Sequence, residues 1–261
     1  MNPQIILEQP NNPNADGFNF KRWNQIKEFG SLDKIYSTLL KDKRVVLVGP
    51  SPSLNHLNLG EWIDSFDIVV RLNRAFPVPL ESQNDLGSRT DIHYHSLCTD
   101  EFNGGPVRFK ELKEHNVFLT CSYPKMIQPF TLDFIKFFEE NKKWQIPYHE
   151  FGLTYYQEIS KMLGTRPNTG TLAILDLLAH EIKELHIIGF TWFKDGWQKT
   201  YKDPKKILGD KYTKDIEKKL EKANLEGRHK QKPQEDLVKE LYLNDERVFI
   251  DDIMKQILNV E

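Results

Sequence analysis

Short apolar runs recur along the chain, and stretches with helical periodicity separate them. Six runs have the length and apolar character of strands: residues 44–49, 67–73, 91–97, 116–123, 183–190 and 247–251. A continuous apolar run that ends at a turn is typical of a strand buried on both faces. Helices are expected over residues 106–114, 131–141, 155–163, 169–181 and 234–243. This alternation predicts an α/β fold whose strands form a doubly wound, mostly parallel sheet.

The N-terminal part precedes the first predicted strand. Residues 8–18 are rich in Asn, Pro and Asp and predict an irregular arm, whereas residues 20–41 have a helical pattern. The expected apolar anchors of that helix are Trp23, Ile26, Phe29, Ile35 and Leu39. The sequence therefore predicts an arm and a helix over 1–42 that pack on a single large domain over 43–261.

The segment 194–232 is long and polar, with many lysines and with Trp197, Tyr201 and Tyr212. A segment of this length without a core pattern is usually a lid or a binding loop, and we expect a lid here. It contains His229, a histidine that lies neither in a predicted strand nor on an evident helix face. His93 and His95 lie at strand spacing and are interpreted as structural.

Composition and charge narrow the class of protein. The chain has 261 residues, 39% of them apolar, and a formal net charge of −2. These values are ordinary for a globular protein and argue against a surface that is wholly a nucleic-acid footprint. Two cysteines, no visible signal peptide and no apolar run of about 20 residues lead us to expect a soluble, reduced, cytoplasmic protein without an integral membrane segment.

The first candidate site follows the first predicted strand, at "VGPSPSL". Small residues such as Gly49, Ser51 and Ser53 at the end of a buried strand let backbone N–H groups approach a phosphate or a ribose. A tight turn without a ligand is the alternative. The stretch matches neither the dinucleotide fingerprint nor the P-loop.

The second candidate lies at the end of the second predicted strand, where Arg71, Asn73 and Arg74 occur together. A buried arginine is costly unless it is paired. Asp85 and Asp91 are the expected partners of Arg71. With Arg74 and Arg89 they would form a buried ion-pair network that fixes the loop.

The third candidate is "TRPNTGTLAILDLLAHEIKELHIIGF", residues 165–190. Asn168 or Thr169 is well suited to cap the helix that follows. Uncapped N–H groups at Gly170 and Thr171 would form an anion site at the helix N-terminus. A capped core helix without a ligand is the alternative.

In this order and spacing, the stretches resemble the motifs of the sialyltransferases, both the eukaryotic-type family and the single-domain bacterial family. Residues 45–91, "VVLVGPSPSL…IDSFDIVVRLNRA…NDLGSRTD", resemble the large sialyl motif. Residues 166–190 resemble the small sialyl motif, and His229 with Glu235 approximates the very short motif. The resemblance covers roughly residues 45–235.

The resemblance implies a Rossmann-like sialyltransferase-type fold (a GT-A variant) and a glycosyltransferase that inverts the anomeric carbon without a metal. The donor would be a nucleotide sugar, CMP-sialic acid or a related sugar, which is a substrate and not a cofactor. The acceptor would be a glycan hydroxyl. No Asp-x-Asp triplet occurs in the sequence, which is consistent with metal independence.

The resemblance also assigns roles to individual residues. His229 would be the general base. The donor would be held by Gly49, Ser51, Ser53, Asn73, Asn168, Thr169, Gly170, Thr171 and Tyr201. The site would be braced by Arg74, Asp85, Arg89 and Glu235.

The chain departs from the family pattern at several positions. Pro50 stands where the family has asparagine, and Phe193 stands where the bacterial enzymes have tyrosine. The cysteines that join the large and small motifs in eukaryotic-type enzymes are absent, and the very short motif with Glu235 is one residue too long. We expect lysines of 199–232 to help neutralise the leaving phosphate.

Two other functions stay open at this point. A basic lid with aromatic residues would also suit a viral DNA-modifying glycosyltransferase that adds a sugar to a hydroxymethylated base. A non-catalytic protein that only binds nucleotide sugars would keep the same fold. DNA and a glycan are therefore alternative acceptor partners.

Overall fold

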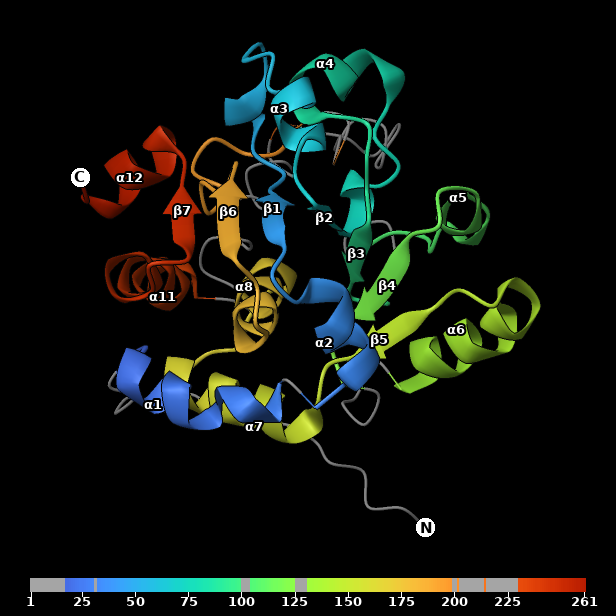
Figure 1. Ribbon diagram of the computed structural model, residues 1–261, viewed down its shortest axis with the longest axis horizontal. Helices are drawn as coiled ribbons and strands as arrows, with labels where there is room; N and C mark the ends of the chain where they lie inside the picture. The colour runs from blue at the N-terminus through green and yellow to red at the C-terminus, as the bar shows by residue number, and fades with distance from the viewer. Residues whose placement is uncertain are drawn as a thin grey trace.

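A seven-stranded parallel sheet forms the centre of the molecule (Figure 1). The computed structural model describes residues 17–30, 32–99, 104–124, 131–198, 201, 214 and 230–261. The strands are β1 (Arg44–Val48), β2 (Ile68–Leu72), β3 (Ile92–His95), β4 (Phe118–Cys121), β5 (Tyr148–Glu150), β6 (Glu184–Ile188) and β7 (Val248–Ile250). Their order is β5-β4-β3-β2-β1-β6-β7, and every neighbouring pair is parallel. The predicted fold class is confirmed.

Alternating side chains of the strands enter hydrophobic clusters on opposite faces of the sheet. Val45 and Leu47 of β1 belong to the largest cluster, whereas Val46 and Val48 belong to the cluster on the other face. A central strand is therefore apolar at every position, which is why it appears as a continuous apolar run.

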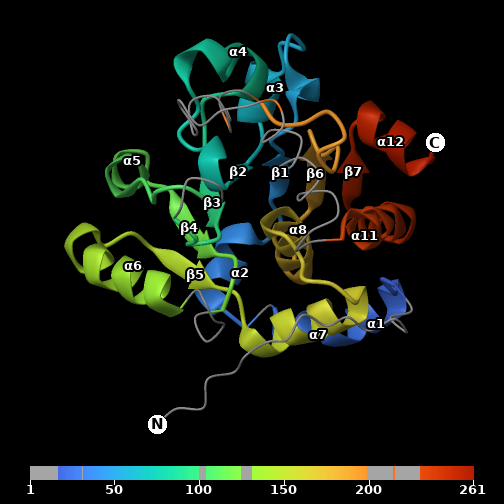
Figure 2. The same ribbon diagram turned by 180° about the vertical axis from the view of Figure 1, so that it is seen from behind.

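Helices cover both faces. The largest cluster includes residues of α1 (Phe20–Ile26), α2 (Lys34–Leu40), α7 (Leu153–Leu163), α8 (Thr169–Ala179), α11 (Gln231–Asn244) and α12 (Asp252–Leu258). The two clusters on the other face include residues of α3 (Gly60–Asp64), α4 (Gln83–Leu86), α5 (Phe109–Glu114) and α6 (Thr131–Trp144). Seen from behind, α1 and α7 lie side by side (Figure 2).

The single helix expected over 20–41 is wrong, because the chain forms α1, a short 3-10 helix η1 (Lys27–Phe29) and then α2. The break lies at Gly30, where an added Cβ would lie 2.6 Å from the Tyr155 ring. A side chain at residue 30 would therefore collide with α7, and glycine allows the close approach.

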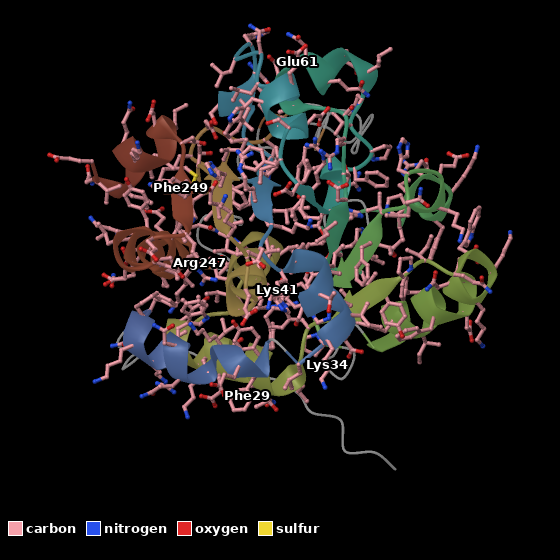
Figure 3. The ribbon with its side chains drawn as sticks, in the orientation of Figure 1. Phe29, Lys34, Lys41, Glu61, Arg247 and Phe249 are labelled. Carbon is pink, nitrogen blue, oxygen red and sulfur yellow. The ribbon has the colours of Figure 1, made fainter. Side chains whose placement is uncertain are left out.

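The break changes which side chains of this region are buried. Trp23 is buried as expected, but Phe29 is 44% exposed and Ile35 is 77% exposed. Phe29 points outward at the edge of the molecule (Figure 3). Tyr36 and Leu40 are buried in place of Ile35. A pattern that assumes one continuous helix assigns the wrong face after the break.

All six predicted strands are present, and the strand β5 and the helices α3, α4 and α12 are additional. β5 is a three-residue edge strand with one buried residue, so it has no apolar run to detect. α12 begins at a cap, because the Asp251 carboxylate accepts a hydrogen bond from the Met254 N–H at 2.8 Å. A helix of seven residues is too short for periodicity to reveal.

A polar network lies under the β3–β5 half of the sheet. The Tyr94 hydroxyl donates to Asp176 Oδ2 at 2.8 Å, and the Tyr36 and Tyr94 hydroxyl oxygens are 2.7 Å apart. The His149 ring stacks on Tyr36 with 4.3 Å between centroids. His149 Nδ1 lies 3.0 Å from Asp33 Oδ2, and its Nε2 lies 3.7 Å from Asp176 Oδ1. The histidine therefore stands between two carboxylates.

The charges around His149 decide its protonation. Burial alone lowers the pKa of His149, but Asp176 and Asp33 outweigh burial and raise that pKa above its ordinary value. His180 is packed against the same group, and burial lowers its pKa. Because the folded state holds the His149 proton more tightly, protonated His149 stabilises the fold.

We expect the stability contribution of His149 to depend on pH. A raised folded pKa gives stability that is fully present below the unfolded value of about 6.5 and is lost as pH rises through the folded pKa. The difference in unfolding free energy between the wild type and His149→Asn should therefore shrink from about pH 5.5 to about pH 8.5. Urea unfolding at both pH values measures it.

His115→Asn is the matched control, because the His115 side chain is exposed. Its difference from the wild type should not shrink in the same way. A His149→Asn difference that stays constant or grows as pH rises would show that the two carboxylates do not hold the His149 proton.

Candidate functional site

The carboxyl ends of β1 and β6 lie side by side at the place where the order of strands in the sheet reverses. From β1 the strands continue to β2 on one side and to β6 on the other, so this is the topological switch point, where parallel sheets bind ligands. The Gly49 N–H donates to the Ile188 carbonyl at 2.8 Å. A Cβ on Gly49 would lie 2.2 Å from the Gly189 carbonyl oxygen. Only glycine fits here. The loop after β1 stays bonded to the one after β6, because the Ser51 N–H donates to the Gly189 carbonyl at 3.1 Å.

The loop after β1 begins a 3-10 helix, η2 (Pro52–Leu54), that Ser51 caps. Ser51 Oγ accepts a hydrogen bond from the Ser53 N–H at 3.0 Å and lies 2.8 Å from Ser53 Oγ. It also donates to Asp195 Oδ2 at 2.7 Å, which joins this loop to the one after β6. Gly49, Ser51 and Ser53 therefore lie together at the switch point.

Asn73 lies at the end of β2 with a positive φ of 45°. Its Oδ1 accepts a hydrogen bond from the Ser96 N–H at 2.9 Å, and its carbonyl oxygen lies 2.7 Å from His93 Nε2. The Tyr201 and Asn73 side chains are hydrogen bonded, and burial raises the pKa of Tyr201, which keeps its hydroxyl neutral. The structure thus brings two of the predicted donor residues, Asn73 and Tyr201, into contact.

The two strand histidines support Asn73 and the loop beside it. Burial lowers the pKa of His93 to about 3 and that of His95 to about 4, so both rings are neutral. The neutral His93 ring donates from Nε2 to the Asn73 carbonyl, and His95 Nε2 lies 3.2 Å from the Gly104 carbonyl. Their interpretation as structural residues agrees with these contacts, and His93 additionally holds Asn73 in its unusual conformation.

The N-terminus of α8 lies beside these loops. Asn168 caps the helix, since its Oδ1 accepts a hydrogen bond from the Thr171 N–H at 2.8 Å. The expectation that the Thr171 N–H is uncapped is therefore wrong, because the asparagine side chain takes it. Gly170 is packed closely, because an added Cβ would lie 2.6 Å from Phe190 and 3.4 Å from Leu72. The helix N-terminus thus touches the ends of both β2 and β6.

Gln234 links α8 to α11 and was missed in the sequence. It is fully buried, and its Oε1 accepts hydrogen bonds from the Asn168 N–H at 2.9 Å and the Thr171 hydroxyl at 2.7 Å. Its Nε2 donates to the Lys230 carbonyl at 2.9 Å. A signal was available, because the very short motif has four residues between its histidine and its glutamate, and four residues separate His229 from Gln234. Gln234 stands where the motif has glutamate, and the acidic residue Glu235 follows it directly.

His229, the predicted base, lies outside the described residues, as do most of the lysines of 199–232. The next residue, Lys230, is held by two bonds: its N–H donates to Thr165 Oγ1 at 3.1 Å, and its carbonyl accepts from Gln234. Glu235 forms an ion pair with Lys194 at 3.2 Å and so connects α11 to the loop after β6.

The loop after β2 is organised around the buried guanidinium of Arg71, which is 1% exposed. Arg71 donates to the Leu86 carbonyl at 2.6 Å, the Arg89 carbonyl at 3.0 Å and the Thr90 hydroxyl at 3.0 Å. Burial lowers the pKa of Arg71 to about 10, which leaves it charged near neutral pH. The expected direct pairing of Arg71 with Asp85 and Asp91 is wrong, because carbonyl oxygens and the Thr90 hydroxyl bind the guanidinium. The charges of Asp64 and Asp91 nevertheless favour the protonated form of Arg71.

The acidic residues of this loop bind other groups. Asp85 Oδ1 accepts a hydrogen bond from the Asn58 N–H at 3.0 Å, and the backbone N–H groups of residues 56 and 58 lower the pKa of Asp85. Arg89 pairs with Asp91 at 3.0 Å and also donates to the Asp64 carbonyl at 2.6 Å. The Asp64 carboxylate in turn accepts from the Arg89 N–H at 3.0 Å.

Arg74 lies beside Gly105, where an added Cβ would be 3.1 Å from the guanidinium carbon. Its positive charge opposes the effect of burial on the pKa of Tyr201. Arg74 therefore belongs to the Asn73–Tyr201 corner of the site, on the β2–β3 side.

Comparison with known proteins gives the family. Residues 20–231 match the family model described as glycosyltransferase family 29 (sialyltransferase). The chain belongs to glycosyltransferase family 29. The family match extends over both sequence motifs whose loops meet at the switch point, and over the polar segment that follows them.

One curated relative of this family 29 chain is CMP-N-acetylneuraminate-beta-galactosamide-alpha-2,3-sialyltransferase 1 of Gallus gallus. It is 29% identical over 163 residues, which are 57% of this chain and 44% of the relative. The chain therefore spans less than half of the length of that relative.

Solved structures of mammalian sialyltransferases share the fold of this family 29 chain. One, in complex with Gal-beta-1-3GalNAc-ortho-nitrophenol, has a TM-score of 0.52 at 17% identity and covers 90% of this chain and 80% of its own. A second has a TM-score of 0.51 at 15% identity, with 90% and 87% covered.

Two further findings concern the expected environment. Within the described part of the chain, no helix has the length and apolar character to cross a bilayer. The structure does not join Cys98 and Cys121 by a disulfide, and burial raises the pKa of the Cys121 thiol.

Replacement of Gln234 should lower the free energy of unfolding much more than replacement of its neighbour Glu235. Gln234→Leu removes the side-chain oxygen that accepts from the Asn168 N–H and from the buried Thr171 hydroxyl. Because each unpaired buried group costs about 1–3 kcal/mol, the free energy of unfolding should fall by roughly 3 kcal/mol. Urea unfolding measures the loss.

Glu235→Gln is the matched control at the adjacent position. It removes only the pair with Lys194, whose side chain is 47% exposed, so the loss should stay below about 1 kcal/mol. Equal losses for the two variants would contradict the assignment of Gln234 as the link between α8 and α11.

Proposed function

We propose that the protein transfers sialic acid from CMP-sialic acid to a hydroxyl group of a glycan. The observation that carries this proposal is that residues 20–231 match family 29 while the motif loops converge at one edge of the sheet. Ser51, Asn73 and Asn168 each lie at or beside the carboxyl end of a strand there. A galactose-containing acceptor is proposed by analogy, because the curated relative is named for a beta-galactosamide acceptor.

The proposed reaction is a single displacement with inversion. The acceptor hydroxyl oxygen bonds to the anomeric carbon, the bond from that carbon to the phosphate oxygen breaks, and CMP leaves. His229 takes the hydroxyl proton, a role that suits an imidazole because it titrates near neutral pH. No metal is required in this proposal, since CMP leaves with a single phosphate and the sequence has no Asp-x-Asp triplet.

The neighbouring groups would stabilise the departing phosphate. The N-terminus of α8 carries the positive end of the helix dipole and lies next to the loops after β2 and β6. The neutral Tyr201 hydroxyl at Asn73 is a hydrogen-bond donor on the other side. Phe193 has no hydroxyl, so Tyr201 is the tyrosine proposed for this role.

The donor proposal predicts a preference for cytidine. CMP should raise the melting temperature of the protein, whereas UMP and GMP at the same concentration should not. A ligand at a hundred times its Kd stabilises the folded state by about 2.7 kcal/mol, which a thermal-shift assay resolves. Equal shifts with all three nucleotides, or none with CMP, would contradict a CMP-linked donor.

Replacement of His229 should separate chemistry from binding. His229→Ala should lower kcat by about 10²–10⁴-fold, the usual contribution of a general base, while the CMP-induced thermal shift stays unchanged. Transfer from CMP-sialic acid to a galactose-terminated oligosaccharide, measured with a chelator present, gives the rate. His115→Ala is the control, because that histidine is an exposed residue at the C-terminal end of α5 and has no proposed role in transfer.

The outcomes separate the alternatives. An unchanged rate in His229→Ala would remove the assignment of the base. If the wild type binds CMP but transfers no sugar, the protein is a non-catalytic protein that binds nucleotide sugars. An acceptor affinity that falls steeply with ionic strength would favour a DNA acceptor, because phosphate contacts release counterions.

A further inference from the structure

The chain reverses sharply after β6, and the reversal returns Asp195 to the loop that follows β1. Trp192 and Phe193 are consecutive residues with positive φ, 50° and 65°. This left-handed conformation is unfavourable for bulky residues. It persists only where the surrounding structure imposes it, which is often at functional sites. The Lys194 N–H closes the turn by donating to the Thr191 carbonyl at 3.0 Å.

The Asp195 carboxylate is clamped between the two loops of the switch point. Ser51 Oγ donates to its Oδ2 at 2.7 Å, and the Thr191 hydroxyl donates to its Oδ1. The buried Gln198 fastens the same segment. Its N–H donates to the Pro50 carbonyl at 2.9 Å and its side chain donates to the Ser51 carbonyl at 2.9 Å. The carboxylate is therefore oriented from both sides.

The carboxylate still faces solvent, because the Asp195 side chain is exposed. An ionised carboxylate has about four acceptor positions, and the Ser51 and Thr191 hydroxyls occupy one on each oxygen. A ligand that offers one hydroxyl to each oxygen can use the remaining positions. A vicinal diol is such a ligand.

The chemistry of a nucleotide-sugar donor decides which of its parts fits. The phosphate and the sugar carboxylate are anionic, so a fixed carboxylate repels them. The ribose carries a 2′,3′-diol, and acidic residues beside the strand ends of Rossmann-like sheets bind ribose hydroxyls. We propose, on the basis of the proposed function, that Asp195 is a specificity-determining residue that binds the ribose diol of CMP and selects ribonucleotides over 2′-deoxyribonucleotides.

Calorimetric titration with CMP and with 2′-deoxy-CMP tests the assignment. The wild type should bind CMP about tenfold more tightly, the usual effect of one charge-assisted hydrogen bond. Asp195→Asn loses the charge and one acceptor oxygen, so the ratio of the two dissociation constants should fall toward one through weaker CMP binding. Glu246→Gln, an exposed carboxylate before β7, should keep the wild-type ratio.

The ratio compares two ligands on one protein, so a purely structural role of Asp195 would weaken both ligands together and leave the ratio unchanged. A wild type that binds CMP and 2′-deoxy-CMP equally overturns the inference and leaves the proposed function intact. An Asp195→Asn variant that keeps the ratio but loses its preference for CMP over UMP assigns Asp195 to the base and also overturns it. A wild type that binds neither nucleotide overturns both proposals.

Discussion

The close approach of β1 and β6 at Gly49 and Gly189 is the constraint on which the candidate site depends. A Cβ on Gly49 would lie 2.2 Å from the Gly189 carbonyl oxygen, so the two backbones come as near as glycine allows. Beyond this point the two loops stay joined, because the Ser51 N–H donates to the Gly189 carbonyl at 3.1 Å and the Ser51 hydroxyl donates to Asp195. The same contact that fixes the sheet therefore fixes the two loops that would face a donor.

Much of the fold could be predicted from the sequence, because a strand that is buried on both faces has a continuous run of apolar residues. The break at Gly30 could not, since it depends on the Tyr155 ring of a distant helix. The partners of Arg71 were predicted by charge, but backbone carbonyls, which leave no trace in the sequence, hold it instead. The motif spacing placed Asn168 and Thr171 correctly at a helix N-terminus, whereas Gln234 could be recognised only from its buried contacts.

The helix α8 connects the candidate site to the interior. Its N-terminus is held by Gln234, and its C-terminus by Arg247, which donates to the Leu178 and His180 carbonyls at 3.0 Å each (Figure 3). Between these ends, Asp176 accepts a hydrogen bond from Tyr94 within the buried polar network. With both ends bonded and its middle anchored, α8 can present the turn that begins at Asn168 as a rigid surface.

The pairing of β1 with β6 has a consequence for the order in which the molecule can be completed. Arg44 and Glu184 are partners across this pair although 140 positions separate them in the chain. During synthesis from the N-terminus, β1 to β5 can pair first, and β1 keeps an open edge until β6 has emerged. The link through Gln234 comes later still. A ribosome-bound chain shorter than this would hold most of the sheet and none of the closed switch point, so the candidate site is expected to form only after residue 234 has emerged.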